Sequence, residues 1–143
     1  MREIRNSVEI AASAARVWSV LTDFASYGEW NPFIVRAAGV VRVGATLDVT
    51  FAPPGGRRMK FRPTIVRVEP GRELAWCARL IVPGLFDGEH AFRITPLAEG
   101  RTRLDQVATF QGWAVPLFPW KTGPGLRAGF ASMLRSLETR ARS

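Results

Sequence analysis

Two polar side chains on otherwise apolar strand faces are the residues of this sequence best placed to do chemistry. Alternate residues of a strand share a face, so His90 accompanies Phe92 on one strand and Gln106 accompanies Phe110 on the next. The turn at Glu99-Gly100 would pair these strands antiparallel and bring the imidazole and the amide near each other. A buried polar group without a partner costs about 1–3 kcal/mol, so we expect the imidazole to be hydrogen-bonded.

Three roles are open for His90. In a structural role, the imidazole is satisfied by Gln106 or by a backbone carbonyl, because buried polar groups are normally paired. As a polar anchor, it orients a carbonyl or hydroxyl group of a ligand. As a general acid or base, it takes part in a reaction, since an ordinary imidazole titrates close to neutral pH.

Other kinds of catalytic site lack the residues that they need. The chain has one His and one Cys, and no zinc-ligand spacing is present. Gly123-Pro124-Gly125 followed by Gly129 is neither a phosphate-binding loop nor a dinucleotide fingerprint, and there is no nucleophile elbow. We therefore expect neither a metal nor a cofactor.

Length and charge restrict the class of protein. A chain of 143 residues is long enough for one domain, which we place at 1–143, with a substantial core. The formal net charge of +8 would favour a polyanionic partner, but the basic residues are scattered and Arg57-Arg58 is the only adjacent pair. We therefore expect no nucleic-acid partner.

The sequence also favours a cytoplasmic location. Cys77 is the only cysteine, so an intrachain disulfide is excluded and a reducing compartment is the simpler interpretation. The N-terminal residues MREIRNSVEI lack the apolar segment of a signal peptide, and no apolar run is long enough to span a membrane. The sequence does not indicate the oligomeric state.

The first third of the chain predicts a strand followed by two short helices. Residues 2–10 alternate between apolar and polar types. Ser13 is a suitable N-cap for a helix whose apolar residues then recur at helical spacing. We expect a second short helix over 24–27, ended by Gly28, and a corner at Pro32, which disfavours helical angles for the residue before it.

The rest of the chain predicts a meander of strands and one final helix. Turn residues separate strands expected at 34–43, 45–52, 57–69, 72–81, 87–97 and 101–111. Pro63 indicates an edge or a bulge in its strand, because proline cannot donate a ladder hydrogen bond. Residues 126–141 have the periodicity of a helix with one apolar face.

Two segments resemble the START-like superfamily, the SRPBCC proteins that include polyketide cyclase/dehydrase-like chains. Ser7 to Phe33 (SVEIAASAARVWSVLTDFASYGEWNPF) is similar to the opening strand and helices of that family. Asp87 to Phe92 followed by Gly100-Arg101-Thr102-Arg103 resembles its His-x-Phe strand and Gly-Thr-Arg turn, with Arg101 as an insertion. The resemblance covers nearly the whole chain and implies an α+β helix-grip fold. In that fold, a curved antiparallel sheet of about seven strands wraps a long C-terminal helix, with two short helices after the first strand.

The resemblance further implies an internal cavity between the sheet and the last helix. Its occupant would be an apolar small molecule such as a lipid, polyketide or quinone. The candidate ligand-binding residues come from the corner, the inward strand faces and the last helix: Trp30, Phe33, Val49, Phe51, Trp76, His90, Phe92, Gln106, Phe110, Trp113, Phe130, Met133 and Leu134.

Aromatic residues outside the strands have two interpretations each. Trp30 either plugs the junction of the short helices with the sheet or forms a wall at the cavity mouth. Trp113, Phe118 and Trp120 either pin the loop before the last helix, as a fixed segment or a lid, or make at most transient contact with a membrane.

Binding or carriage of the small molecule is the function that we expect. One alternative is a cyclase or dehydratase in which His90 acts as acid or base, as the resemblance to polyketide cyclases implies. The other is a protein-interaction module of the co-chaperone type, which predicts an exposed apolar patch and no internal cavity.

Overall fold

The computed structural model describes residues 2–79, 87–113 and 123–143, in which strands are the commonest element. In chain order, the elements are β1 (Arg2–Ile10), α1 (Ala14–Thr22), the 3-10 helix η1 (Phe24–Ser26), α2 (Tyr27–Trp30), β2 (Ile34–Ala38), β3 (Asp48–Phe51), β4 (Met59–Phe61), β5 (Thr64–Glu69), β6 (Glu73–Arg79), β7 (Asp87–Pro96), β8 (Thr102–Gln111) and α3 (Gly123–Arg142).

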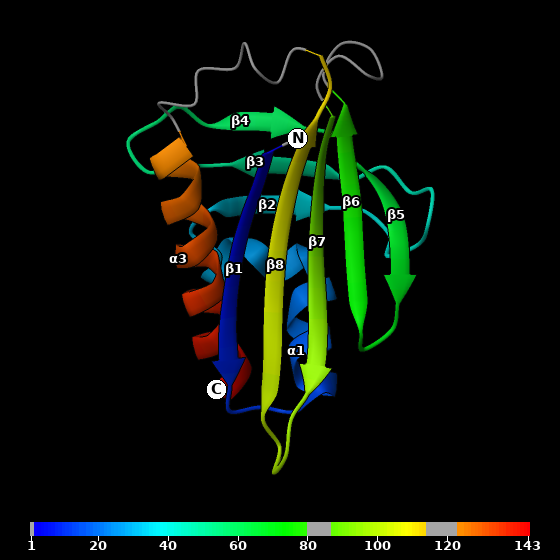
Figure 1. Ribbon diagram of the computed structural model, residues 1–143, viewed down its shortest axis with the longest axis vertical. Coiled ribbons are helices and arrows are strands. Elements are labelled where there is room, and N and C mark those ends of the chain that lie inside the picture. Colours follow the sequence, from blue (N-terminus) through cyan, green and yellow to red (C-terminus); the bar gives the residue numbers. More distant parts are fainter. Residues whose placement is uncertain (1, 80–86, 114–122) are drawn as a thin grey trace.

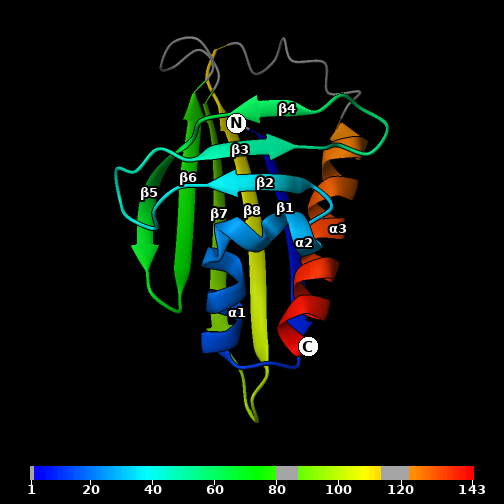
Figure 2. The same ribbon diagram turned by 180° about the vertical axis from the view of Figure 1, so that it is seen from behind.

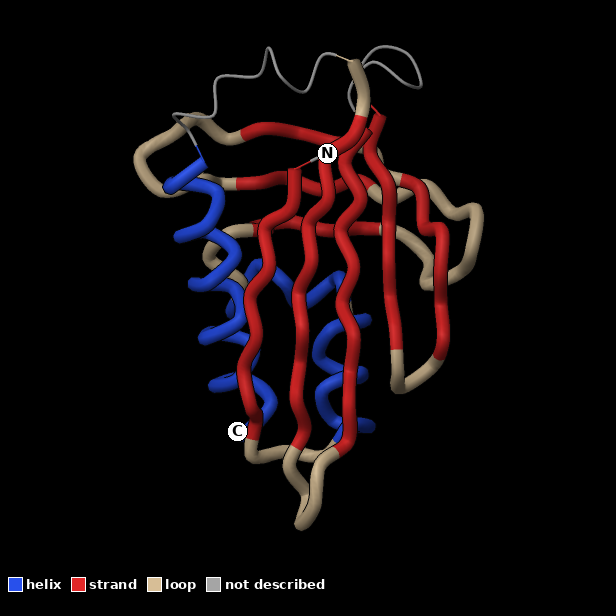
Figure 3. The backbone as a smooth tube through the Cα atoms, viewed as in Figure 1, coloured by secondary structure: helices blue, strands red, loops and turns tan. Residues whose placement is uncertain are grey.

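The strands form two antiparallel sheets, as Figures 1 and 3 show. The large sheet has the order β1-β8-β7-β6-β5, and the small sheet has the order β2-β3-β4. Seen from behind, the small sheet crosses one half of the large sheet, α1 covers the other half, and α3 runs along one side (Figure 2). This is the expected α+β helix-grip architecture, with eight strands in the described residues.

Pro63 is the point at which the chain passes from one sheet to the other. The prediction of a single strand over 57–69 is wrong, because β4 and β5 lie in different sheets. Proline has no N–H to donate, so the ladder cannot continue through this residue. Its carbonyl instead accepts a hydrogen bond from Leu47 N at 2.8 Å, and Thr46 forms a bridge with Thr64. The two sheets are thereby joined along one seam and enclose the interior.

Strands β2 and β3 are shorter than the predicted 34–43 and 45–52. The backbone leaves extended geometry at Gly39, whose φ is 146°. A Cβ at this glycine would lie 2.3 Å from Leu47 Cδ2, so only glycine fits where the chain turns against its neighbour. The connection between the two strands is therefore a longer loop than the sequence pattern suggested.

The N-terminal helices follow the prediction except at Gly28. Ser13 caps α1 as expected, its Oγ accepting a hydrogen bond from Arg16 N at 3.1 Å. Gly28 does not end the second helical segment, because it lies inside α2. The helix ends at Asn31, which precedes Pro32 and has extended angles. Asn31 Oδ1 accepts hydrogen bonds from the amides of residues 33 and 34 at 3.0 and 2.9 Å and fixes the corner.

The long helix α3 extends a little beyond the predicted range of 126–141. Its apolar face is buried, with Met133 and Leu137 fully inaccessible to solvent and Phe130 and Leu134 nearly so. The helix packs against β1 and α1. None of the helices in the described ranges is long and apolar enough to cross a bilayer.

Gly129 allows Phe33 to lie directly against α3. A Cβ at Gly129 would be 2.4 Å from Phe33 Cδ1, and the Phe33 ring is confined by Phe51 and Phe130 at centroid distances of 5.1 and 5.0 Å. We expect Gly129→Ala to lower the free energy of unfolding, because overpacking costs about 1–3 kcal/mol and alanine regains only about 1 kcal/mol in helix propensity. Urea denaturation measures the difference.

Gly125 provides a matched control on the same helix. A Cβ at Gly125 would meet no atom closer than 3.8 Å, so Gly125→Ala should leave stability unchanged or raise it. Equal stability of the two variants would contradict the role assigned to Gly129.

Candidate functional site

An apolar cavity of about 210 Å³ lies between the large sheet, the small sheet and α3. It is at the end of the molecule where β6 and β8 finish and β4 crosses behind them (Figure 1). Three parts of the fold contribute its lining: Trp76, Ala78, Gly88, Glu89, His90, Ala108 and Phe110 from the large sheet, Phe33, Phe51, Met59, Phe61 and Pro63 from the small sheet and its flanks, and Leu126 and Phe130 from α3.

Small residues on the large sheet create the space. Ala78, Gly88 and Phe110 lie opposite one another on β6, β7 and β8, so two small residues stand beside one large ring. In the next inward row, Trp76, His90 and Ala108 are opposite one another. Because inward residues on neighbouring strands are normally large enough to fill a core, these rows leave a hollow.

The opposite wall is aromatic. Phe33 contacts Phe51 at a centroid distance of 5.1 Å and Phe130 at 5.0 Å. Phe51 in turn contacts Phe61 at 5.2 Å, edge to face. These rings support one another in the edge-to-face and tilted arrangements that aromatic pairs favour, so they form a preorganised wall.

His90 and Gln106 form a hydrogen bond, as the sequence suggested. His90 lies opposite Ala108 and Gln106 lies opposite Phe92, so the two side chains meet diagonally across the strand pair. Gln106 Nε2 is 2.7 Å from His90 Nε2. The amide donates, so the ring nitrogen accepts and the neutral imidazole carries its proton on Nδ1. Gln106 thereby fixes the orientation and the tautomer of His90.

Burial keeps His90 uncharged. Its side chain is 5% exposed and its ring lies among Trp76, Phe92 and Phe130, with centroids 5.2, 4.4 and 5.0 Å away. Desolvation in this apolar environment lowers the pKa of His90 to about 3. The imidazole is therefore a neutral hydrogen-bonding group at physiological pH and a weak base.

One polar atom of Gln106 has no hydrogen-bond partner among the described residues. This atom is the buried Oε1, while Nε2 also lies 3.7 Å from Met133 Sδ. Gln106 is not part of the cavity lining, whereas His90 is. Among the described residues, His90 is therefore the buried polar side chain that a molecule in the cavity would touch.

Glu89 also borders the cavity, but its carboxylate is engaged elsewhere. It accepts a hydrogen bond from Arg67, which also binds Glu73 at 3.0 Å. No group of three or more His, Cys, Asp or Glu side chains within the described ranges is arranged to hold a metal ion.

The structure brings together part of the predicted set of site residues. Six of them line the cavity: Phe33, Phe51, Trp76, His90, Phe110 and Phe130. Five others are buried in the core next to it: Val49, Phe92, Gln106, Met133 and Leu134. Trp113 is 71% exposed beyond the end of β8 and is not part of the lining. Phe118 and Trp120 lie outside the described residues.

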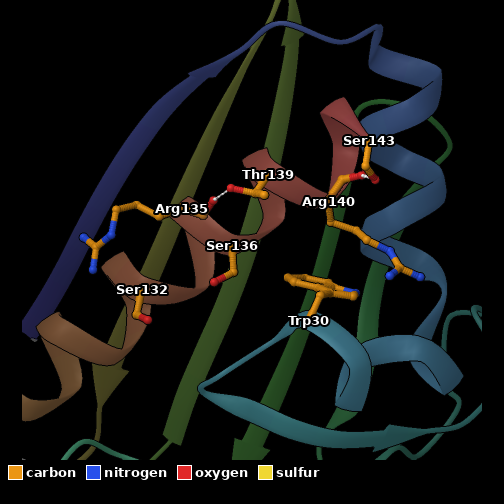
Figure 4. Close-up of a pocket in the computed structure, with 7 residues that line it drawn as sticks. All are labelled: Trp30, Ser132, Arg135, Ser136, Thr139, Arg140 and Ser143. Carbon is orange, nitrogen blue, oxygen red and sulfur yellow. Dashed lines mark hydrogen bonds between the residues drawn. The ribbon is translucent and has the colours of Figure 1, made fainter.

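Trp30 lies away from the apolar cavity. Its ring packs on Tyr27 at a centroid distance of 5.1 Å. Figure 4 shows it facing the polar side of α3, near Ser136 and Arg140, across a hollow of about 440 Å³. Arg140 is also paired with Glu29 at 3.1 Å. Trp30 therefore does not line the apolar cavity, and its role as a plug where the short helices meet the sheet stays a prediction.

The sequence did not predict the cavity-lining residues whose position depends on how the two sheets cross. Met59, Phe61 and Pro63 belong to a segment that the alternating pattern assigned to one long strand. Ala78, Gly88 and Ala108 are small, strand alternation placed Glu89 on the outward face, and Leu126 lies at the start of the predicted helix. The sequence does carry one signal for the hollow. Ala78 and Ala108 are small residues at inward strand positions, next to large residues on the same face.

Comparisons with known proteins agree with this architecture. A family model described as polyketide cyclase / dehydrase and lipid transport matches residues 1–142. None of the curated protein sequences compared with the chain matches it.

Solved structures with the same fold span nearly the whole chain. A START superfamily protein from Mycobacterium smegmatis has a TM-score of 0.78 at 20% identity, covering 98% of this chain and 97% of its own. The Zhui aromatase/cyclase from Streptomyces sp. R1128 has a TM-score of 0.79 at 18% identity, with coverage of 99% and 93%. A point mutant of norcoclaurine synthase from Thalictrum flavum has a TM-score of 0.68 at 17% identity, with coverage of 98% and 93%.

Proposed function

The chain belongs to the polyketide cyclase / dehydrase and lipid transport family. We propose that it binds a compact apolar molecule in the cavity that β4 helps to line. The molecule has one or two rings and carries one carbonyl or hydroxyl group, which meets His90. The single observation that carries this proposal is the apolar cavity with His90 as the buried polar side chain in its wall.

The size of the cavity supports a small occupant. Ligand sites for drug-sized molecules usually measure about 300–1,000 Å³, and an apolar cavity of about 150 Å³ holds benzene. The volume of about 210 Å³ lies between these values. It suits one ring or two fused rings better than a sterol or a long polyketide chain.

The lining supports an apolar body with one polar group. Rings of Phe33, Phe51, Phe61 and Phe110 would cover the faces and edges of a flat molecule. Apolar burial supplies the affinity, since about 200 Å² of ligand surface at ~25 cal/mol/Å² contributes about 5 kcal/mol before ordering costs. A hydrogen bond to His90 would then select the orientation of the ligand.

The protonation state of His90 favours binding over turnover. A general base is most effective when its pKa is close to the working pH, and burial lowers the pKa of His90 to about 3. An internal cavity also supports a small-molecule site over an interaction module of the co-chaperone type. A cyclase or dehydratase activity remains the second candidate, and the similarity to the aromatase/cyclase fold is the observation that favours it.

The role of His90 can be tested with a pair of matched probes, naphthalene and 2-naphthol. Replacing His90 by Phe keeps an aromatic ring but removes the hydrogen bond, which contributes about 0.5–1.5 kcal/mol. We expect His90→Phe to weaken binding of 2-naphthol by up to about tenfold relative to naphthalene. Fluorescence titration of both probes against both proteins measures this ratio.

Gln106 offers an intermediate variant. Gln106→Leu leaves His90 in place without its orienting partner, so we expect a smaller loss for 2-naphthol than His90→Phe produces. An unchanged ratio of the two affinities in His90→Phe would contradict the anchoring role. Chemical conversion of a bound ligand that stops in His90→Phe would instead support the second candidate.

A further inference from the structure

The outer face of the small sheet carries a cluster of cations that form no ion pair within the described residues. Arg36 on β2 is opposite Thr50 on β3, and Thr50 is opposite Lys60 on β4, so the two cations flank one small residue. Arg58 precedes β4 and shares with them a surface hollow of about 550 Å³. This face is turned toward the viewer in Figure 2. We refer to Arg36, Arg58 and Lys60 as the cationic face.

Two carboxylates near the cationic face, Asp48 and Glu29, are already paired with other residues. Asp48 on β3 binds Arg62 at 3.1 Å, and Glu29 on α2 binds Arg140 at 3.1 Å. Within the described part of the chain, none of the three side chains of the cationic face forms an ion pair. Cations gathered on one face without paired carboxylates give a positive potential, so this arrangement suits a surface that meets an external anion.

We propose that the cationic face binds the anionic headgroups of a membrane surface. Alternation along β4 places Met59 and Phe61 on the cavity side and Lys60 on the outer side. Met59 lies between Arg58 and Lys60 in the chain and is 40% exposed on β4, which is an edge strand of the small sheet. Cations beside an exposed methionine at the edge of a sheet match the boundary between headgroups and acyl chains better than they match an acidic protein.

The cationic face lies on the other side of β4 from the cavity, so a membrane contact there bears on the cavity. The side of β4 opposite Lys60 forms part of the cavity wall, through Met59 and Phe61. A membrane held by the cationic face would therefore lie close to the end of the molecule at which an apolar molecule is bound. The contact itself does not depend on the proposed ligand, so it can be tested on the protein alone.

Co-sedimentation with vesicles tests this inference. The vesicles contain either phosphatidylcholine alone or equal parts of phosphatidylcholine and phosphatidylglycerol. Each basic residue near an anionic leaflet strengthens binding about fivefold, so the double variant Arg58→Gln, Lys60→Gln should bind the anionic vesicles about 25-fold more weakly than the wild type. Binding should also weaken as salt is added, because the headgroup charges are screened.

A second double variant provides a control with the same net charge. Arg72→Gln, Arg135→Gln removes two exposed cations that form no ion pair in the described residues and lie on the β5–β6 turn and on α3. This control should bind the anionic vesicles within a few-fold of the wild type. Equal loss in the two double variants, or no binding of the wild type to anionic vesicles, would overturn the proposal. Binding to poly-glutamate but not to vesicles would also overturn it and point to an acidic protein.

Discussion

Either of the substitutions Ala78→Leu and Ala108→Leu should abolish binding of a two-ring ligand without unfolding the protein. Ala78 and Ala108 line the cavity from adjacent inward rows of the large sheet. A longer side chain at either position would enter the empty space and exclude the ligand. Because the apolar contribution of such a ligand is about 5 kcal/mol, we expect the dissociation constant to rise at least about 100-fold.

The same variants should be as stable as the wild type or more so. Filling an existing hollow adds apolar contacts and avoids the strain that overpacking a dense core would cause. Calorimetric titration gives the affinity, and urea denaturation gives the stability. Ala128→Leu on the exposed side of α3 is the matched control and should bind normally. Wild-type affinity in both cavity variants would show that the ligand binds elsewhere.

Acidification should destabilise the protein through His90. Burial lowers the pKa of His90 to about 3 in the folded state, whereas an unfolded histidine titrates near 6.5. Between these values the unfolded chain binds a proton that the folded chain does not. The contribution of His90 to stability is therefore full above about pH 6.5 and is lost progressively as the pH falls toward about 3.

The expected loss between pH 6.5 and pH 5 is about 1.6 kcal/mol, since the slope rises from half its full value at pH 6.5 and approaches the full value of about 1.36 kcal/mol per pH unit at pH 5. His90→Phe removes the titrating group but keeps all carboxylates, so the difference between the two proteins isolates this contribution. Chemical denaturation at several pH values gives both curves. Parallel curves for wild type and His90→Phe over this window would contradict a buried, neutral imidazole.

The sequence predicted the fold where local chemistry and tertiary structure agree. Ser13 and the spacing of apolar residues located α1, and the apolar face of the last helix is the buried face of α3. The sequence prediction was wrong where contacts between distant parts of the chain determine the secondary structure. Gly28 stays helical because Asn31 and Pro32 end the segment, and the long strand through Pro63 divides between two sheets.

The site was predictable on the large sheet and not on the small one. Alternation places His90 and Gln106 on one face, so their hydrogen bond follows from the pairing of β7 and β8. The contribution of Phe61 depends on β4 crossing behind that sheet, which no periodicity in the sequence expresses. The hollow itself depends on Ala78 and Gly88, whose effect is visible only once their neighbours are known.

Native mass spectrometry of the protein isolated from its own cells tests the central claim most directly. The account predicts a wild-type chain carrying one small apolar molecule, released by organic solvent, and an Ala108→Leu chain without it. If the wild type has the mass of the polypeptide alone and gains none when incubated with one- and two-ring carbonyl or hydroxyl compounds, the cavity is not a binding site.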